Sequence, residues 1–164
     1  MALIVEDATG LANAESYVSV ADADAYTAAR ALAFPTWSAA SSTEAVKEAS
    51  LRLATEYIEI KYGPRFLAEK LVATQALSFP DAGGFVPSAV IRATIELAVI
   101  ALAGSLWSIE DNSRVIIEES KGVGPLKKSV KYSDREGLQK VYRQIDTMLQ
   151  PLLRSGAVLR TVRI

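Results

Sequence analysis

Apolar residues recur every three or four positions along most of the chain, and loops rich in proline, glycine and serine interrupt this period. Recurrence at this spacing is typical of amphipathic helices. It predicts four helices, over residues 19–32, 43–62, 87–105 and 135–153. Pro35 stops the first of them, and the pair Gly63 and Pro64 stops the second, because a proline ring cannot continue a helix.

Two of these helix starts carry a side chain suited to capping. Ser19 precedes the first helix with Asp22 three residues on, and Ser41 stands at the same spacing before Glu44. A serine hydroxyl in this position accepts a hydrogen bond from a free backbone N–H of the first turn. We therefore expect the helices to begin close to these serines.

The second and third helices differ in how their apolar residues are distributed. The second has an apolar face, which we expect to point to the core, made of Val46, Ala49, Leu53, Ala54, Tyr57 and Ile58. The third is apolar nearly all round, with Arg92 and Glu96 as its charges. Such a helix is surrounded by protein. Because one chain of 164 residues offers little material for this, we expect a neighbouring subunit to cover part of it.

Between the third and fourth helices the period changes to one typical of strands. Residues 114–118 and 126–132 are rich in β-branched residues, and the glycines Gly122 and Gly124 lie between them. This pattern predicts a β-hairpin over about 114–132. A two-stranded hairpin is marginally stable alone, so it needs support from the helices or from another chain.

These elements predict a mainly α fold in one domain over residues 1–164, a length that suits a single core. We expect an extended N-terminal segment over 1–18. A bundle of about four helices over 19–153 would contain the inserted hairpin at 114–132. A C-terminal arm over 154–164 is apolar and basic, with no room to fold on itself.

Neither a membrane span nor a signal peptide is predicted. The longest nearly apolar run, residues 86–107, is interrupted by Arg92 and Glu96, and a spanning helix needs about 20 apolar residues. The N-terminus lacks the basic flank and long apolar stretch of a signal peptide. We expect a protein that is made and used without secretion.

Histidine and cysteine are absent from the chain. Disulfides, thiolate nucleophiles and cysteine zinc sites are therefore excluded. The commonest general base and the commonest metal ligand are also missing. Gly122 and Gly124 lack the third glycine of a dinucleotide loop and fit a hairpin turn better. We expect no enzyme, no cofactor and no metal site.

Charge is divided unevenly along the chain. Residues 1–120 hold 8 Lys and Arg against 16 Asp and Glu, a net charge of −8, whereas residues 121–164 hold 10 against 3, a net charge of +7. This suggests that the two parts face different partners. The alternative is that the charges mix on one folded surface, since halves of a sequence need not be halves of a structure.

The basic residues of the predicted hairpin form a candidate contact surface. It consists of Lys121, Lys127, Lys128, Lys131 and Tyr132, with Arg135 just beyond. Strand alternation would place Lys127, Ser129 and Lys131 on one face, and Lys128 and Val130 on the other. Such a surface could bind nucleic-acid phosphates or dock an acidic protein. A single aromatic residue and a pI near 5.6 argue against a dedicated nucleic-acid binder.

Several segments resemble a family of small proteins encoded in the head-gene clusters of tailed phages. The resemblance covers nearly the whole chain and is carried by residues 3–19, 54–58, 75–80, 86–90, 93–98 and 149–153. Members are often catalogued as "putative DnaT-like" single-stranded-DNA-binding proteins. The resemblance implies a structural virion protein, a head–tail connector or adaptor, which forms a homo-oligomeric, usually dodecameric, ring under the portal and extends the DNA channel.

The resemblance also implies the partners of the chain. They would be further copies of itself, the portal protein, a stopper or tail-completion protein, and genomic DNA passing through without sequence-specific binding. The location would be the virion neck, and the host cytoplasm during assembly. The tail would bind the portal or a neighbouring subunit through Val158, Leu159, Arg160, Thr161, Val162, Arg163 and Ile164. The alternative hypothesis is a single-stranded-DNA-binding protein that uses the hairpin lysines and Arg135.

Overall fold

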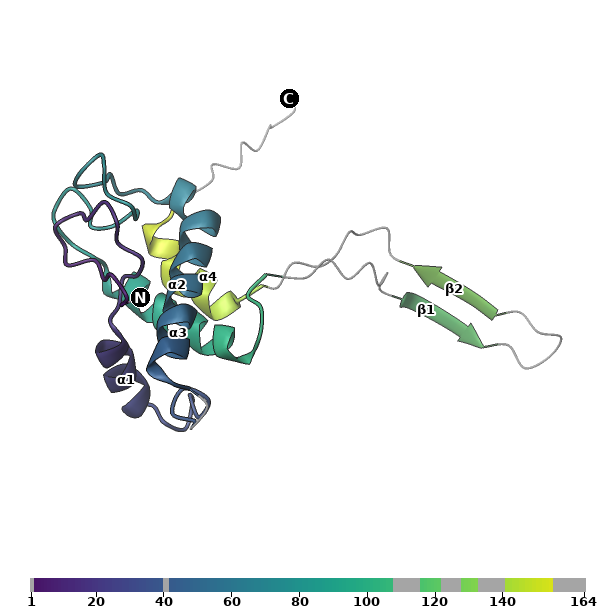
Figure 1. The fold of residues 1–164 in the computed structure, drawn as a ribbon. Helices are drawn as coiled ribbons and strands as arrows, with labels where there is room; N and C mark the ends of the chain where they lie inside the picture. The colour runs from purple at the N-terminus through teal and green to yellow at the C-terminus, as the bar shows by residue number, and fades with distance from the viewer. Residues whose placement is uncertain (1, 40–41, 108–115, 122–127, 133–140, 155–164) are drawn as a thin grey trace, which may run out of the picture. The chain divides into compact units, whose positions relative to one another are not determined.

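The computed structural model describes residues 2–39, 42–107, 116–121, 128–132 and 141–154 (Figure 1). Within these residues the protein is mainly helical, as predicted, with four α-helices: α1 (Val20–Ala28), α2 (Glu44–Lys61), α3 (Ser88–Ala103) and α4 (Arg143–Leu149). Short 3-10 helices follow α2 at Gly63–Arg65 and α4 at Gln150–Leu152. The chain divides into two compact units, one of Met1–Leu106 with Tyr142–Ile164 and the other of Trp107–Val141.

The first helix, α1, begins as predicted and ends earlier. The Ser19 hydroxyl oxygen accepts from the backbone N–H of Asp22 at 3.1 Å, which confirms the predicted cap. The expected end at residue 32 is wrong, because α1 stops at Ala28. The backbone N–H of Arg30 donates to the carbonyl of Thr27 at 3.0 Å, and this tighter turn breaks the α-helical ladder.

The long helix α2 has the predicted extent but only part of the predicted inner face. Thr43 is its N-cap, and Ser41, which was expected to cap it, lies outside the described residues. Leu51, Ala54 and Ile58 are fully buried. The expected core positions Val46 and Leu53 are wrong: these side chains are 43% and 49% exposed.

The apolar helix α3 is buried by its own chain. Val90, Ala93, Leu97 and Ala98 have no exposed surface, and α3 packs against both α2 and α4. The expectation that a neighbouring subunit must cover this helix is therefore wrong for the residues named here. None of the helices described is both long and apolar enough to cross a membrane.

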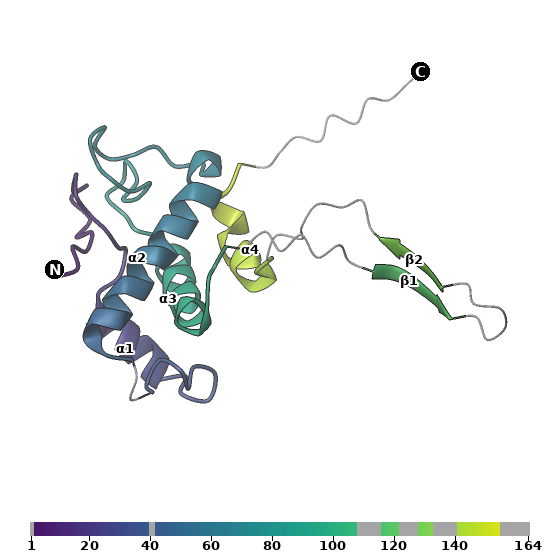
Figure 2. The same ribbon diagram turned by 45° about the vertical axis from the view of Figure 1, so that its right-hand side comes forward.

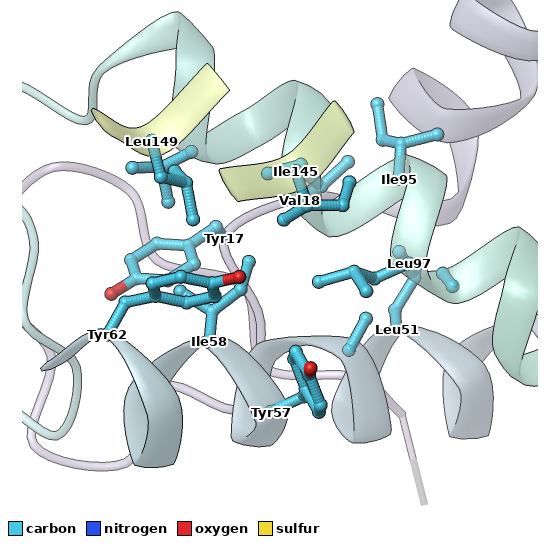
Figure 3. Close-up of a cluster of buried hydrophobic side chains, with 14 of the residues drawn as sticks. Tyr17, Val18, Leu51, Tyr57, Ile58, Tyr62, Ile95, Leu97, Ile145 and Leu149 are labelled. Atoms are coloured by element: carbon cyan, nitrogen blue, oxygen red, sulfur yellow. The ribbon is translucent and has the colours of Figure 1, made fainter. Parts of the chain in front are cut away.

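The core lies where α2, α3 and α4 meet the chain that leads into α1. Figure 3 shows side chains from all four segments converging, among them Tyr17, Val18, Leu51, Ile58, Tyr62, Ile95, Leu97, Ile145 and Leu149. The views in Figures 1 and 2 show α2 and α3 side by side, with the short α4 beside them. Apolar burial of this kind is the main stabilising term of the fold.

The last helix differs from its prediction over 135–153. Residues 133–140 lie outside the described residues, and Tyr142 has non-helical dihedrals, φ −98° and ψ 79°. The Tyr142 hydroxyl donates to the carbonyl of Leu106 at 3.2 Å, and its ring packs edge-on against Tyr57 with centroids 5.7 Å apart. These contacts turn Tyr142 out of the helical path, so α4 begins at Arg143.

The N-terminal segment, expected to be extended, folds back on itself. The backbone N–H of Glu6 donates to the carbonyl of Ser16 at 2.9 Å. The buried carboxylate of Glu6 accepts from the backbone N–H groups of Gly10 and Leu11 at 2.9 and 3.0 Å. Two charge-assisted hydrogen bonds close the turn between these residues.

The loop before α3 is held against α2 by polar contacts. Glu59 accepts from the backbone N–H and the hydroxyl of Ser78 at 3.1 and 2.7 Å. It also accepts a hydrogen bond from the Tyr17 hydroxyl. Burial and the charge of Glu59 raise the pKa of Tyr17, so this phenol stays protonated and keeps donating.

The unit Trp107–Val141 contains two described strands, in the stretch where the sequence predicts a hairpin. β1 (Ile116–Lys121) pairs antiparallel with β2 (Lys128–Tyr132). The register places Lys121 opposite Lys128 and Glu118 opposite Lys131. An irregularity between Ile116 and Glu118 interrupts the ladder.

Candidate nucleic-acid interface

The end of α1 carries a stacked pair of an arginine and a tyrosine. Tyr26 and Arg30 are four residues apart, a spacing that brings side chains together along a helix. The Arg30 guanidinium carbon lies 3.9 Å from the centre of the Tyr26 ring. One guanidinium N–H also donates to the backbone carbonyl of Tyr26 at 3.2 Å. Arg30 is exposed, whereas Tyr26 is half-buried beneath it.

A second aromatic ring lies beside this pair. The centroids of Phe34 and Tyr26 are 6.0 Å apart with their planes tilted by 36°. Phe34 is half-buried, and Leu32, two residues before it, is fully exposed. The segment after α1 therefore displays apolar side chains next to the guanidinium of Arg30.

The segment that carries Phe34 is anchored by Trp37. This indole is 1% exposed, and its N–H donates to a carboxylate oxygen of Asp24 at 2.6 Å. Lys47 on α2 pairs with the same oxygen at 2.7 Å and lies 5.3 Å from the Trp37 ring centre. Burial raises the pKa of the Asp24 carboxyl, but these two hydrogen bonds outweigh it and leave the pKa below its ordinary value.

Tyr26 is also fixed from the side of α3. Its hydroxyl donates to the Glu96 carboxylate at 3.0 Å, and Glu96 is only 7% exposed. Burial raises the pKa of Tyr26, and the hydrogen bond to Glu96 acts in the same direction. The positive charges of Arg30 and Arg92 oppose this rise. Arg92 is exposed and lies on α3 one turn before Glu96.

We name Tyr26, Arg30, Phe34 and Arg92 the Arg30 patch. It joins two exposed cations to two half-buried rings. Guanidinium planes stack on nucleobases and also donate to phosphates. Aromatic rings offer a stacking surface that any base can use. The geometry therefore suits unpaired nucleotides, whose bases are free to stack.

A second cluster of aromatic residues and a lysine is packed too closely for this purpose. Tyr57 and Tyr62 are 2% and 0% exposed, and their rings meet edge-to-face at 6.4 Å. Lys61 donates to the Tyr57 hydroxyl at 3.0 Å and pairs with Asp146 at 3.5 Å. This cluster joins α2 to α4 and leaves no ring face open to a base.

The residues expected from sequence to form the contact surface are only partly described. Lys121, Lys128, Lys131 and Tyr132 belong to β1 and β2, where the register is defined. Lys127, Arg135 and the tail positions 158–164 lie outside the described residues. The pairing places Lys121 opposite Lys128, so two positive residues occupy facing positions at the connected ends of the strands.

Sequence reasoning missed the Arg30 patch. The one local signal was the spacing of Tyr26 and Arg30 at the end of a helix. The contact of Phe34 with Tyr26 and the hydrogen bond from Tyr26 to Glu96 on α3 are tertiary contacts, which no local pattern reveals.

Other kinds of site have less support. Within the described residues no three acidic side chains gather to hold a metal ion. An open apolar pocket of about 320 Å³ is lined by Leu67, Ala68, Phe79, Asp81, Pro87, Pro151 and Leu152. Among these described lining residues Asp81 is the one that carries a charge, and a single carboxylate is too little convergent chemistry for catalysis.

The fold and the patch together define a small helical protein with an aromatic and cationic surface. The family model described as "Putative DnaT-like ssDNA binding protein" matches residues 1–164. The chain therefore belongs to this family. No curated protein and no solved structure matches it.

This finding corrects the interpretation of the resemblance. The predicted head–tail connector is wrong, and so are the virion, neck and channel roles attached to it. The family whose model matches the whole chain is described by single-stranded DNA binding, not by a role in the virion. The portal, the ring and the stopper protein receive no support from it. Among the predicted partners, the family implies DNA.

Proposed function

We propose that this protein binds single-stranded DNA and that it acts by binding, without catalysing a reaction. The observation that carries the proposal is the match of the family model to the entire chain, residues 1–164. The absence of histidine and cysteine supports a binding role, since it removes the commonest catalytic side chains.

The Arg30 patch supplies the surface that such binding needs. An unpaired base would stack on the exposed plane of Arg30 or on Phe34, and Arg92 would meet a neighbouring phosphate. Glu96 holds the Tyr26 hydroxyl, and Tyr26 in turn supports the Arg30 guanidinium. The cation is thus positioned before the ligand arrives, which lowers the entropic cost of binding.

The lysines of β1 and β2 would add contacts to phosphates. In the register Lys121 is paired with Lys128, and Glu118 with Lys131. Contacts of this kind are independent of base sequence and weaken as salt rises. We therefore expect binding with little sequence preference.

Substitutions in the patch test the proposal against general electrostatics. Affinity for a labelled oligo-dT of about 20 nucleotides would be measured by fluorescence anisotropy. Phe34→Ala should weaken binding about 10-fold, because stacking on one ring is worth about 1–3 kcal/mol per base. Arg30→Ala should have an effect of similar size.

Arg65→Ala is the matched control, because Arg65 is an exposed arginine outside the patch. It removes the same charge and should change affinity much less than Arg30→Ala. Equal effects of Arg30→Ala and Arg65→Ala would overturn the assignment to the patch. Circular dichroism on each variant would show that α1 is retained.

A further inference from the structure

One carboxylate beside the Arg30 patch, that of Asp24, joins three separate segments of the protein. Asp24 lies on α1, and one of its oxygens accepts from the indole N–H of Trp37 at 2.6 Å. The same oxygen pairs with the ammonium group of Lys47 on α2 at 2.7 Å. The segment after α1 is thereby tied to both helices. We name Asp24, Trp37 and Lys47 the Asp24 lock.

Two members of the Asp24 lock are largely buried and the third is not. Trp37 is 1% exposed and the Lys47 side chain is 15% exposed, whereas the Asp24 side chain is 47% exposed. A buried N–H or ammonium group needs an acceptor, because leaving it without one costs free energy. Asp24 is an acceptor for both groups. Because its own side chain is half in solvent, a substitution there would remove the acceptor and leave no large cavity in the core.

The Asp24 lock reaches the Arg30 patch through Phe34. The backbone N–H of Trp37 donates to the carbonyl of Phe34 at 3.3 Å, so both residues belong to one turn. The Phe34 ring lies 6.0 Å from the ring of Tyr26, which is two residues after Asp24 on α1. The turn is therefore held to the same helix at two points, once by a hydrogen bond and once by a ring contact.

We propose that Asp24 is a positioning residue for single-stranded DNA binding, which holds Phe34 where an unpaired base can stack on it. This inference rests on the proposed function and adds to it a residue that acts through another side chain. A ring that is held in place before the base arrives loses less conformational entropy on binding. Without the lock, the turn would populate further conformations, and the apparent affinity would fall with the fraction of chains that can bind.

The negative charge of Asp24 gives the proposal a sign that simple electrostatics does not share. A carboxylate repels phosphates, so removing one beside a DNA-binding surface should strengthen binding if charge alone matters. The positioning role predicts the opposite. Asp24→Ala should weaken the binding of a labelled oligo-dT of about 20 nucleotides by up to about 10-fold, the loss expected for Phe34→Ala. Asp24→Asn keeps an oxygen that can accept from the indole, and it should recover part of this loss.

The matched control is Asp22→Ala, which removes the same charge from the same helix. Asp22 is exposed, and it points about 200° away from Asp24 around the helix. The Ser19 hydroxyl accepts from the backbone N–H at position 22, so this cap of α1 does not depend on the side chain that is removed. Asp22→Ala should leave the affinity unchanged or raise it.

A double-mutant cycle separates positioning from a general loss of structure. Asp24→Ala would be made in the parent protein and in Phe34→Ala, and fluorescence anisotropy would give the affinity of all four chains. Circular dichroism would show that each chain is folded at the temperature of the assay. Because Asp24 acts through Phe34, its substitution should weaken binding by less than about two-fold once the phenylalanine is absent. A role in overall folding would weaken binding equally in both backgrounds.

The outcomes distinguish this inference from the proposed function. No binding by the parent protein would overturn the proposed function and the inference with it. If the parent binds, an affinity that Asp24→Ala leaves unchanged or raises would overturn the inference alone. An equal loss with and without Phe34, or an equal loss in Asp22→Ala, would do the same. A loss in Asp24→Ala that requires Phe34 is the result that the positioning role predicts.

Discussion

The helices α2 and α3 lie against each other in the core, yet they meet their surroundings in opposite ways. α3 is apolar almost throughout and suggested a need for a second chain, but the protein buries it unaided. α2 is rich in charge and suggested an ordinary amphipathic helix, but it leaves Val46, Leu53 and Ile60 in solvent. The comparison teaches that the apolar content of a helix does not by itself indicate how much of it the fold buries.

The largest expected difference between the two helices comes from a leucine-to-alanine substitution in each of them. Leu97 on α3 is fully buried, so Leu97→Ala should lower the free energy of unfolding by about 2–5 kcal/mol. Leu53→Ala should lower it by less than about 0.5 kcal/mol. Urea unfolding would measure both, and equal losses would contradict the placement of Leu53 outside the core.

Removing the hydrogen bond between α1 and α3 should have an intermediate effect on the free energy of unfolding. Tyr26→Phe removes the hydroxyl that donates to Glu96, a carboxylate that is 7% exposed. An unsatisfied buried acceptor costs about 1–3 kcal/mol, and we expect unfolding to become easier by an amount in this range. Thermal unfolding would measure it. Adding Glu96→Gln should recover part of the loss, and no loss in Tyr26→Phe would show that this hydrogen bond does not support α3.

The smallest expected effect concerns pH at the end of α2. Burial and the hydrogen bond to Asp146 raise the pKa of Tyr62 to about 12 from an ordinary value near 10. The raised pKa favours the protonated phenol in the folded state, so its contribution to stability is complete below pH 10 and is lost as the pH rises towards 12.

Tyr62→Phe should therefore flatten the decline of stability between about pH 10 and 12. Urea unfolding at a series of pH values would measure the slope. Ile60→Ala, at an exposed neighbour on α2, is the control and should leave the slope unchanged. An unchanged slope in Tyr62→Phe would contradict the raised pKa.

The sequence predicted the helices best where their end signals are local. The cap at Ser19 and the stop after α2 depend on adjacent residues, so both could be expected. The end of α1 and the start of α4 depend instead on the turn at Arg30 and on the contacts of Tyr142. A hydropathy pattern contains neither.

The sequence pattern assigned the buried and the exposed apolar residues of α2 to one face, and the reason is physical. Leu53 and Ala54 are adjacent in sequence and point about 100° apart, so one broad apolar face explained both until burial separated them. The candidate site was hidden for a related reason. Tyr26 and Glu96 are brought together by tertiary packing, whereas the lysines at 121–131 form a visible charge run.

The central claim is single-stranded DNA binding, and a direct titration of the full chain tests it. A labelled strand of about 20 nucleotides and its duplex would be compared at salt concentrations from about 50 to 200 mM. The account predicts tighter binding of the single strand, with an affinity that falls steadily as salt rises. Undetectable binding at the lowest salt, or equal binding of strand and duplex, would contradict it.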